Sequence, residues 1–249
     1  MTLIQAALLG LVQGLTEFLP VSSSGHLVIL QKLFGFTHPP VTFDVLVHTA
    51  TLGAIILVFR EDIRKIDKKL TSAILVGSAP TALMGIWLSS MEDALFNSLS
   101  LVAIALLGTT VLLASSKYIK RVHRKERKNV DTKTALIIGA AQGLAIIPGI
   151  SRSAATIVIG LWLGLDQRTA VRFSFLLAIP AILGAQLLKI DSLGSNQIAT
   201  SALAIGFVIA VISGWISLKA LRGIVERAKL HTFALYTLVL ALLLLLVKF

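Results

Sequence analysis

Two polar segments interrupt a chain that is otherwise apolar. The first, residues 13–26, contains the acid Glu17, a proline, three consecutive serines and the imidazole of His26. The second, residues 142–156, contains a proline and a Ser-Arg-Ser triplet centred on Arg152. On membrane-insertion scales an ionised side chain costs roughly 2.5–3.5 kcal/mol at the centre of a helix. Such groups in apolar sequence therefore predict a polar cavity that has a function.

The first segment places an acid next to the start of a helix. Gln13 and Glu17 are four residues apart and share one helical face, and Pro20 then ends that helix. The next half-helix begins at three hydroxyls, with His26 in its first turn. Serines cap helix N-termini, where free N–H groups and the helix dipole favour phosphate. The three serines are Ser22, Ser23 and Ser24.

The second segment repeats this device with a guanidinium. Pro148 and Gly149 end one half-helix, and the Ser-Arg-Ser triplet opens the next. The planar fork of Arg152 can bind two phosphate oxygens at once. If the two tips meet, we expect Glu17, Ser23, His26 and Arg152 to be catalytic toward a phosphate ester or anhydride at the head of a lipid. The expected substrate-binding residues are Gln13, Ser22, Ser24, Ser151, Ser153 and Thr156.

Each of these residues also has a structural explanation. Glu17 could neutralise Arg152 in an ion pair that has no catalytic role, and His26 could be a satisfied polar residue of a packed hairpin. We expect Gln142 to tie broken backbone together. His48 is equally compatible with supporting the site and with a hydrogen bond between helices.

The composition predicts that these segments lie in a membrane. Of 249 residues, 56% are hydrophobic and 14% are charged, whereas soluble domains carry about 25% charged residues. Six apolar stretches are long enough to span a membrane. Two other apolar regions, 2–35 and 134–165, are broken near their middles into pieces too short to cross the bilayer. We therefore predict an all-α polytopic membrane protein with six transmembrane helices and two re-entrant helical hairpins. The six expected spans are roughly 42–60, 70–90, 98–117, 169–188, 198–219 and 231–248.

The two halves of the chain resemble each other at an offset of about 130 residues. Each half would hold one hairpin and three crossings, and an odd number of crossings inverts the second half relative to the first. The prediction is one membrane domain, 1–249, built as an inverted repeat of 1–130 and 131–249. The matching positions are the Gln-Gly-Leu triplets at 13 and 142, the Pro and Ser pairs at 20/23 and 148/151, and the Leu-Gly-Ala triplets at 52 and 183.

The charge distribution predicts an orientation. The formal net charge is +11, and most Lys and Arg fall in loops 60–69, 117–133 and 219–230. Short basic loops are typical of the cytoplasmic face, so we expect both termini outside and no nucleic-acid partner. The chain has no cysteine, which excludes disulfides, thiolate metal sites and a cysteine nucleophile.

Both polar segments resemble one known family. Residues 13–26 resemble its (Glu/Gln)-x-x-x-Glu region, and residues 148–156 resemble its Pro-Gly-x-Ser-Arg-Ser-x-x-Thr region. The family is undecaprenyl-diphosphate phosphatase, also called the bacitracin-resistance protein. The resemblance implies removal of the terminal phosphate from a polyprenyl diphosphate. The product would be the monophosphate carrier lipid used in cell-envelope synthesis. The resemblance also implies a cell-membrane location and a catalytic site that opens to the outer face.

The resemblance also implies residue roles and a cofactor. By motif match, Glu17, Ser23, His26, Ser151 and Arg152 carry over. A divalent metal, Mg²⁺ or Ca²⁺, is implied, with Glu17 as its ligand. Many members of the family have glutamate at the position of Gln13. This chain therefore offers the metal one carboxylate fewer.

Several alternatives stay open at this point. The nucleophile could be Ser23, with Glu17 or His26 as base, or His26 itself, or water. The inverted repeat is also typical of transporters, so the chain could move a polyprenyl phosphate lipid across the bilayer. A scaffold role is disfavoured by the cost of a buried acid and guanidinium. A homodimer, the prenyl length and the identity of the metal are left open.

Overall fold

The computed structural model describes residues 1–119, 126–190, 198–227 and 229–246. In these residues the structure is helical apart from turns, loops and one isolated β-bridge, so the all-α prediction is confirmed. The α-helices are α1 (Leu3–Phe18), α2 (Ser23–Leu33), α3 (Val41–Val58), α4 (Arg60–Arg64), α5 (Lys68–Ser89), α6 (Glu92–Asn97), α7 (Leu99–Ser115), α9 (Thr132–Leu144), α10 (Arg152–Trp162), α11 (Gln167–Leu188), α12 (Thr200–Glu226) and α13 (Phe233–Leu246). Two 3₁₀ turns, η1 (Ser116–Tyr118) and η3 (Leu230–Thr232), lie beside α7 and α13.

Five described helices are long and apolar enough to cross a membrane, and they match five of the six predicted spans. They are α3, α5, α7 with its extension to Tyr118, α11 and α12. The sixth prediction falls on α13, whose described part has 14 residues; residues 247–249 lie outside the described chain. The chain is thus a multi-pass membrane protein, and the sixth span stays a prediction.

Helix α12 continues seven residues beyond the predicted end at 219, to Glu226. Its basic residues explain the difference. The Lys219 ammonium lies 3.6 Å from the ring centroid of Trp215, and Arg222 pairs with Asp62 at 3.3 Å. Because Lys219 has a partner on α12 and Arg222 has one on α4, these two charges do not end the helix. The predicted loop 60–69 likewise contains a short helix, α4.

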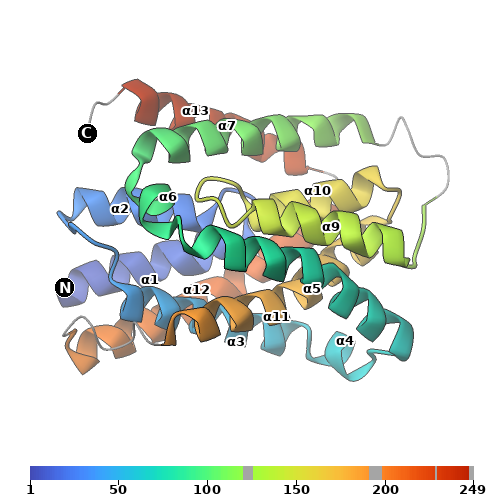
Figure 1. Ribbon diagram of the computed structural model, residues 1–249, viewed down its shortest axis with the longest axis horizontal. Helices are drawn as coiled ribbons and strands as arrows, with labels where there is room; N and C mark the ends of the chain where they lie inside the picture. The colour runs from blue at the N-terminus through green and yellow to red at the C-terminus, as the bar shows by residue number, and fades with distance from the viewer. Residues whose placement is uncertain (120–125, 191–197, 228, 247–249) are drawn as a thin grey trace.

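Both broken regions form helix pairs. The first pair, α1 and α2, is separated by residues 19–22, and the second, α9 and α10, by residues 145–151. Each second helix is capped by serine: Gly25 N–H donates to Ser22 Oγ at 3.3 Å, and Ala154 N–H donates to Ser151 Oγ at 3.2 Å. Figure 1 shows the two pairs entering from opposite ends of the molecule with their turns in the middle.

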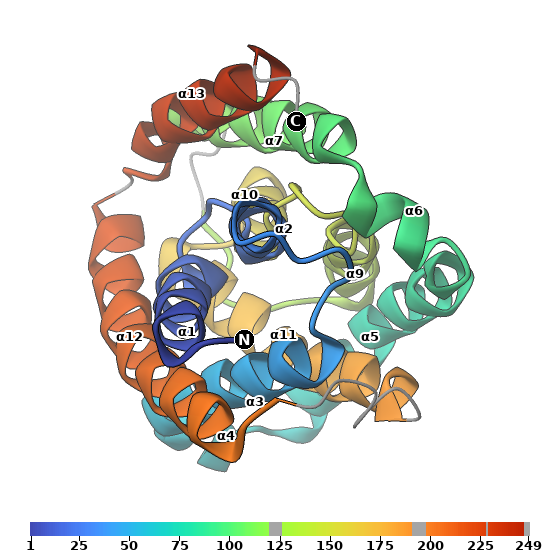
Figure 2. The same cartoon turned by 90° about the vertical axis from the view of Figure 1, so that its left-hand side faces the viewer.

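The four hairpin helices are surrounded by α3, α5, α7, α12 and α13, as the end-on view of Figure 2 shows. Glycines allow the closest packing. A Cβ on Gly10 of α1 would stand 2.4 Å from the carbonyl oxygen of Gly206 on α12. A Cβ on Gly139 of α9 would stand 1.9 Å from the carbonyl oxygen of Gly77 on α5. Small residues of this kind let membrane helices approach closely, so each hairpin is held against one outer helix.

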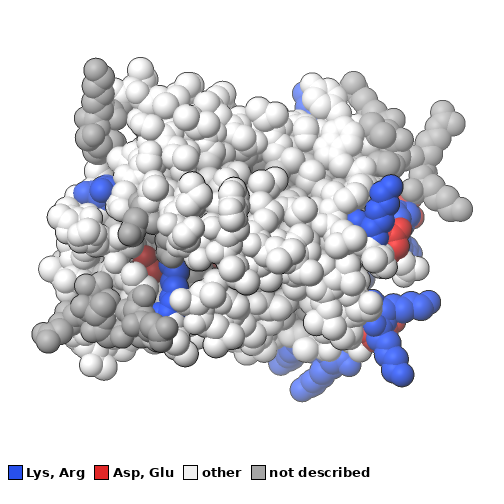
Figure 3. All heavy atoms as spheres, in the orientation of Figure 1, with Lys and Arg blue, Asp and Glu red and all other residues white. Residues whose placement is uncertain are grey.

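Lys and Arg gather at one end of the molecule, where α4 and the start of α9 lie (Figure 3). This agrees with the prediction that the basic loops share one face, although residues 120–125 of the middle loop lie outside the described chain. The exposed cations of the three loops are Arg60, Arg64, Lys65, Lys68, Lys69, Lys117, Arg127, Lys128, Lys133, Lys219, Arg227 and Lys229.

Candidate active site

The turns of the two hairpins meet, as the sequence predicts. The N–H of Gly149 donates to Oγ of Ser22 at 3.1 Å, and Oγ of Ser153 donates to the carbonyl of Leu19 at 3.3 Å. Both bonds join residues more than 120 positions apart in the chain. The first-turn serines of α2 and α10 therefore face a common region.

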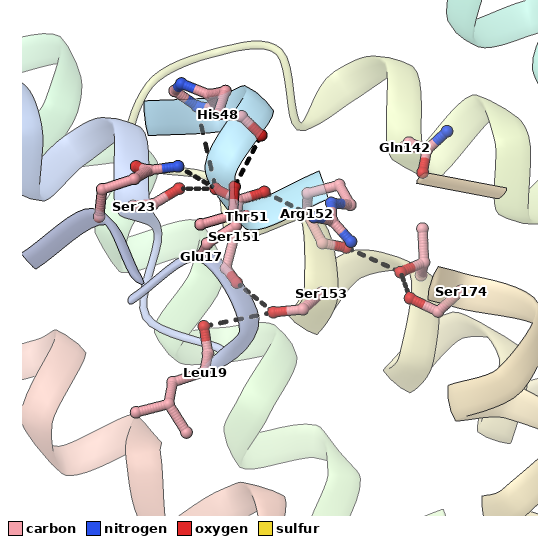
Figure 4. Close-up of polar contacts among 12 residues, drawn as sticks. Glu17, Leu19, Ser23, His48, Thr51, Gln142, Ser151, Arg152, Ser153 and Ser174 are labelled. Carbon is pink, nitrogen blue, oxygen red and sulfur yellow. Dashed lines mark hydrogen bonds and ion pairs between the residues drawn. The ribbon is translucent and has the colours of Figure 1, made fainter. Parts of the chain in front are cut away.

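Glu17 is the centre of that region (Figure 4). Its Oε1 accepts from Nη2 of Arg152 at 2.6 Å, while its Oε2 accepts from Oγ of Ser23 at 2.6 Å and from Nε2 of Gln13 at 3.0 Å. The Glu17 and Arg152 side chains are 7% and 15% exposed. Low exposure strengthens an ion pair but makes either charge costly if its partner is lost. Four predicted site residues are thus brought together by the fold.

Two polar atoms of this cluster are buried and lack a hydrogen-bond partner within the described chain: Nη1 of Arg152 and Oε1 of Gln13. Native proteins leave few such groups unpaired, so each one calls for an explanation. The guanidinium donor suits an anionic oxygen, and the amide oxygen suits a cation or a water. The cluster therefore has an unused donor and an unused acceptor on either side of the Glu17 carboxylate.

The start of α2 is strained. Ser22 has φ +69°, a conformation rare for residues other than glycine. Its Oγ accepts from Gly25 N–H in its own helix and from Gly149 N–H in the other hairpin. Because Ser22 caps one helix and also holds the second turn, its contacts to both hairpins maintain this unfavourable backbone conformation.

His26 bonds residues other than Glu17, Arg152 and Ser23. Ring Nδ1 of His26 donates to the Ser22 carbonyl at 2.7 Å, since a carbonyl oxygen can only accept. Ring Nε2 lies 2.7 Å from the hydroxyl of Tyr236 on α13. The two rings also stack, with centroids 5.7 Å apart. In contrast, Nε2 of His48 on α3 lies 3.9 Å from Oε2 of Glu17, which places His48 at the site.

The remaining predicted residues support the cluster from nearby. Ser151 and Ser153 lie 3.2 Å apart through their hydroxyls, and Ser22 and Ser24 lie 3.4 Å apart. Thr156 has partners within the protein, and its predicted contact with substrate stays a prediction. Its hydroxyl bonds the Arg152 carbonyl and pairs with Ser174 on α11, as expected of a threonine inside a helix.

Gln142 links separate helices, whereas the prediction was that it ties broken backbone together. Its Nε2 donates to Oγ1 of Thr81 on α5 at 3.2 Å and to the Leu177 carbonyl on α11 at 3.4 Å. The contact also explains why Gln142 and Gln13 differ in role although they occupy matching positions. Gln13 bonds an acid of its own helix, whereas Gln142 bonds neighbouring helices.

One aromatic ring contacts Arg152 and packs against two others, and no sequence pattern predicts this group. The Arg152 guanidinium lies 5.5 Å from the Phe175 ring, which contacts Phe18 at 5.6 Å and Phe59 at 5.5 Å between centroids. The Arg222 guanidinium lies 4.5 Å from the far side of the column, at Phe59. All three rings are fully buried. We call Phe18, Phe175 and Phe59 the aromatic column.

The aromatic column ends at an ion-pair cluster. The Asp62 carboxylate forms an ion pair with Nε of Arg172 at 3.0 Å and accepts a hydrogen bond from Nη2 of Arg222 at 3.3 Å. Asp62 belongs to α4, and the two arginines belong to α11 and α12. This cluster therefore fastens the basic end of the first half of the chain to the second half.

The available metal ligands are few. In the described residues there is no group of three or more His, Cys, Asp or Glu side chains that could hold a metal ion. The oxygens at the centre are the Glu17 carboxylate, the unpaired amide oxygen of Gln13 and the Ser23 hydroxyl. Mg²⁺ is commonly held by one or two carboxylates together with substrate phosphates and waters. These residues fit a cation shared with a phosphate substrate.

Comparison with known proteins identifies the family of the chain. The chain matches the family described as bacitracin resistance protein BacA over residues 6–243. Proteins named undecaprenyl-diphosphatase are similar over nearly their whole length. The one from Halothermothrix orenii is 42% identical over 245 residues, covering 95% of this chain and 94% of the relative. Those from Desulfosudis oleivorans (43%) and Korarchaeum cryptofilum (38%) each cover 95% of both chains. The family indicated by the two polar segments is confirmed, and the chain belongs to the bacitracin resistance protein BacA family.

Proposed function

We propose that this protein hydrolyses a polyprenyl diphosphate, with undecaprenyl diphosphate as the first candidate, to the monophosphate and inorganic phosphate. The observation that carries the proposal is the contact of Glu17 with both Arg152 and Ser23 where two helix N-termini meet. The relatives are named for the same reaction. The product would return to cell-envelope synthesis as a carrier lipid, which accounts for a role in bacitracin resistance.

Arg152 and the helix N-termini bind the terminal phosphate. The unpaired Nη1 of Arg152 donates to a phosphate oxygen while Nη2 stays on Glu17. Donors fixed in a water-poor site stabilise charge more strongly than they would in water. Because the diphosphate is highly charged, neutralising it is the main task of the protein in phosphoryl transfer.

Ser23 is the nucleophile that the geometry favours. Its hydroxyl donates to Glu17 at 2.6 Å, which is the contact expected between a nucleophile and its base. Oγ of Ser23 bonds to the terminal phosphorus as the bond from phosphorus to the bridging oxygen breaks, and the serine proton passes to Glu17. Water then hydrolyses the phosphoserine. His26, which bonds Ser22 and Tyr236, is the less favoured nucleophile, and attack by water activated by Glu17 is the remaining alternative.

A divalent cation, Mg²⁺ or Ca²⁺, would be held by Glu17 and the free amide oxygen of Gln13 together with the substrate phosphates. When bound, it would supply positive charge that Arg152 alone cannot provide. Phosphate release by the purified protein with and without EDTA, followed by readdition of each metal, tests this assignment. Full activity after chelation contradicts it.

The proposed topology has six spans and two re-entrant hairpins, inverted between the halves. Opposed hairpins and the matching glycine contacts of α1 with α12 and of α9 with α5 support it. The basic end is cytoplasmic, and the site opens to the other face. Exposed positions Asn129 and Ser90, replaced singly by cysteine in this cysteine-free chain, should react with an impermeant maleimide from opposite faces. Reaction from the same face would contradict the topology.

The activity is tested with purified protein in detergent and a series of polyprenyl diphosphates. We expect phosphate release that rises with prenyl length toward undecaprenyl. Opposed hairpins also favour a second candidate, a carrier that moves a polyprenyl phosphate across the bilayer. Binding of the lipid without phosphate release would reject the phosphatase and leave the carrier.

A further inference from the structure

The turn of the second hairpin rests directly on α7. Gly149 has φ +104°, and a Cβ there would stand 2.5 Å from the carbonyl oxygen of Val102 and 2.7 Å from Cβ of Ala105. Neither contact leaves room for a side chain. The first hairpin reaches the same place, because a Cβ on Gly25 would stand 3.3 Å from Val102 and from Gly149. Helix α7 is therefore the surface on which both turns meet.

One polar side chain of α7 bonds this turn on two sides. Oγ1 of Thr109 donates to the carbonyl of Gly149 at 2.8 Å and accepts from the N–H of Ser151 at 3.0 Å. Thr109 is 1% exposed. A hydroxyl supplies one donor and two acceptor positions, so a single threonine satisfies both backbone groups. Without it, a carbonyl and an N–H would remain buried and unpaired.

These bonds fix the residue that precedes Arg152. Ser151 caps α10, and Arg152 is the first residue of that helix. The N–H of Gly149 is held by Ser22 of the first hairpin, so the turn is fixed from the α7 side and from the α2 side. The position of the guanidinium relative to Glu17 then depends on where this turn lies.

We propose that Thr109 is a positioning residue, which acts through Gly149 and Ser151 to hold the Arg152 guanidinium and the N-terminus of α10 against the substrate phosphate. The assignment rests on the phosphatase activity proposed above. Thr109 touches neither Glu17 nor Arg152 through any hydrogen bond in the described chain, so its effect is transmitted by the backbone of the turn.

The test replaces Thr109 by valine, which keeps the shape and removes the hydroxyl. We expect kcat per folded molecule to fall about 10- to 100-fold, the loss typical of a displaced catalytic group. Thr109→Ser, which keeps the hydroxyl, should restore kcat to within about threefold of the original protein. Thr110→Val is the matched control. That threonine lies next in α7 but bonds Thr237 and the Leu106 carbonyl, and its loss should leave kcat unchanged.

A double-mutant cycle with Arg152→Lys shows whether Thr109 acts through Arg152. The effect of Thr109→Val should shrink to under about threefold when Arg152 is already changed, because coupled residues are not additive. An undiminished effect in that background overturns the proposal, and so does a kcat loss equal to that of Thr110→Val. If Thr109→Val does not fold, Thr109→Cys is compared with Thr109→Ser, and equal kcat values reject the proposal. An original chain that releases no phosphate rejects the proposed function instead.

Discussion

Replacing Arg152 with lysine separates the two roles that its guanidinium can play. Nη2 pairs with Glu17 at 2.6 Å, whereas Nη1 is buried without a partner in the described chain. Lysine keeps a positive charge for Glu17 but carries it on one compact ammonium, which cannot reproduce the planar fork. If Nη1 donates a hydrogen bond to the substrate phosphate, the lysine variant should fold but bind the diphosphate substrate weakly.

The expected magnitude follows from the bond that is lost. A hydrogen bond to a charged group contributes roughly 1.5–3 kcal/mol. Since each 1.4 kcal/mol is about a factor of ten, kcat/KM should fall roughly 10- to 150-fold. Arg152→Ala is the companion variant. It leaves the Glu17 carboxylate, 7% exposed, without a counter-ion, and breaking a buried pair in this way costs about 3–5 kcal/mol of folding stability.

The assay is phosphate release from undecaprenyl diphosphate by purified protein in detergent, with thermal unfolding of each variant measured in parallel. Arg152→Lys should unfold close to the original temperature while losing most of its activity, and Arg152→Ala should lose both. A lysine variant with kcat/KM within about threefold of the original would refute this reasoning. Arg152 would then be a structural partner of Glu17 with no contact to phosphate.

Three further outcomes are expected. Glu17→Gln removes the base and the metal carboxylate, so phosphate release should fall at least about 100-fold in the same assay. Ser22→Ala leaves the Gly149 N–H unpaired, and thermal unfolding should report a loss of about 1–3 kcal/mol. Gly139→Ala would set a Cβ 1.9 Å from a carbonyl of α5, with a loss of about 1–3 kcal/mol or failure to fold. Gly108→Ala is the control, because a Cβ at that position has no atom within 4 Å. Its unfolding temperature should stay unchanged.

The helix breaks and their serine caps could be predicted because their causes are local. Pro20 and Pro148 remove a backbone donor, and the serines that follow supply a cap wherever the rest of the chain lies. The meeting of the two turns was also predictable, since the repeat orders the same residue types in both segments. Apolar length likewise located five spans.

Contacts between distant helices could not be predicted in this way. His26 and His48 are both single histidines in apolar sequence, and nothing near either one shows that His48 is the one that contacts Glu17. Tyr236 and Thr109 each lie beside another polar residue in an apolar helix, where a threonine can satisfy its hydroxyl within its own helix. Only the tertiary packing gives Tyr236 its contact with His26 and Thr109 its bonds to the second turn.

The aromatic column has a consequence for the membrane itself. Buried charged groups can draw water and ions into a membrane protein, and the described chain carries one such set at Glu17 and another at Asp62, at its basic end. Two fully buried rings, Phe175 and Phe59, lie between the two arginines that belong to these sets, and Phe18 packs against Phe175. Packed apolar rings exclude water. We therefore expect water to reach the Glu17 and Arg152 pair without a continuous hydrated connection through these rings to the cluster at Asp62.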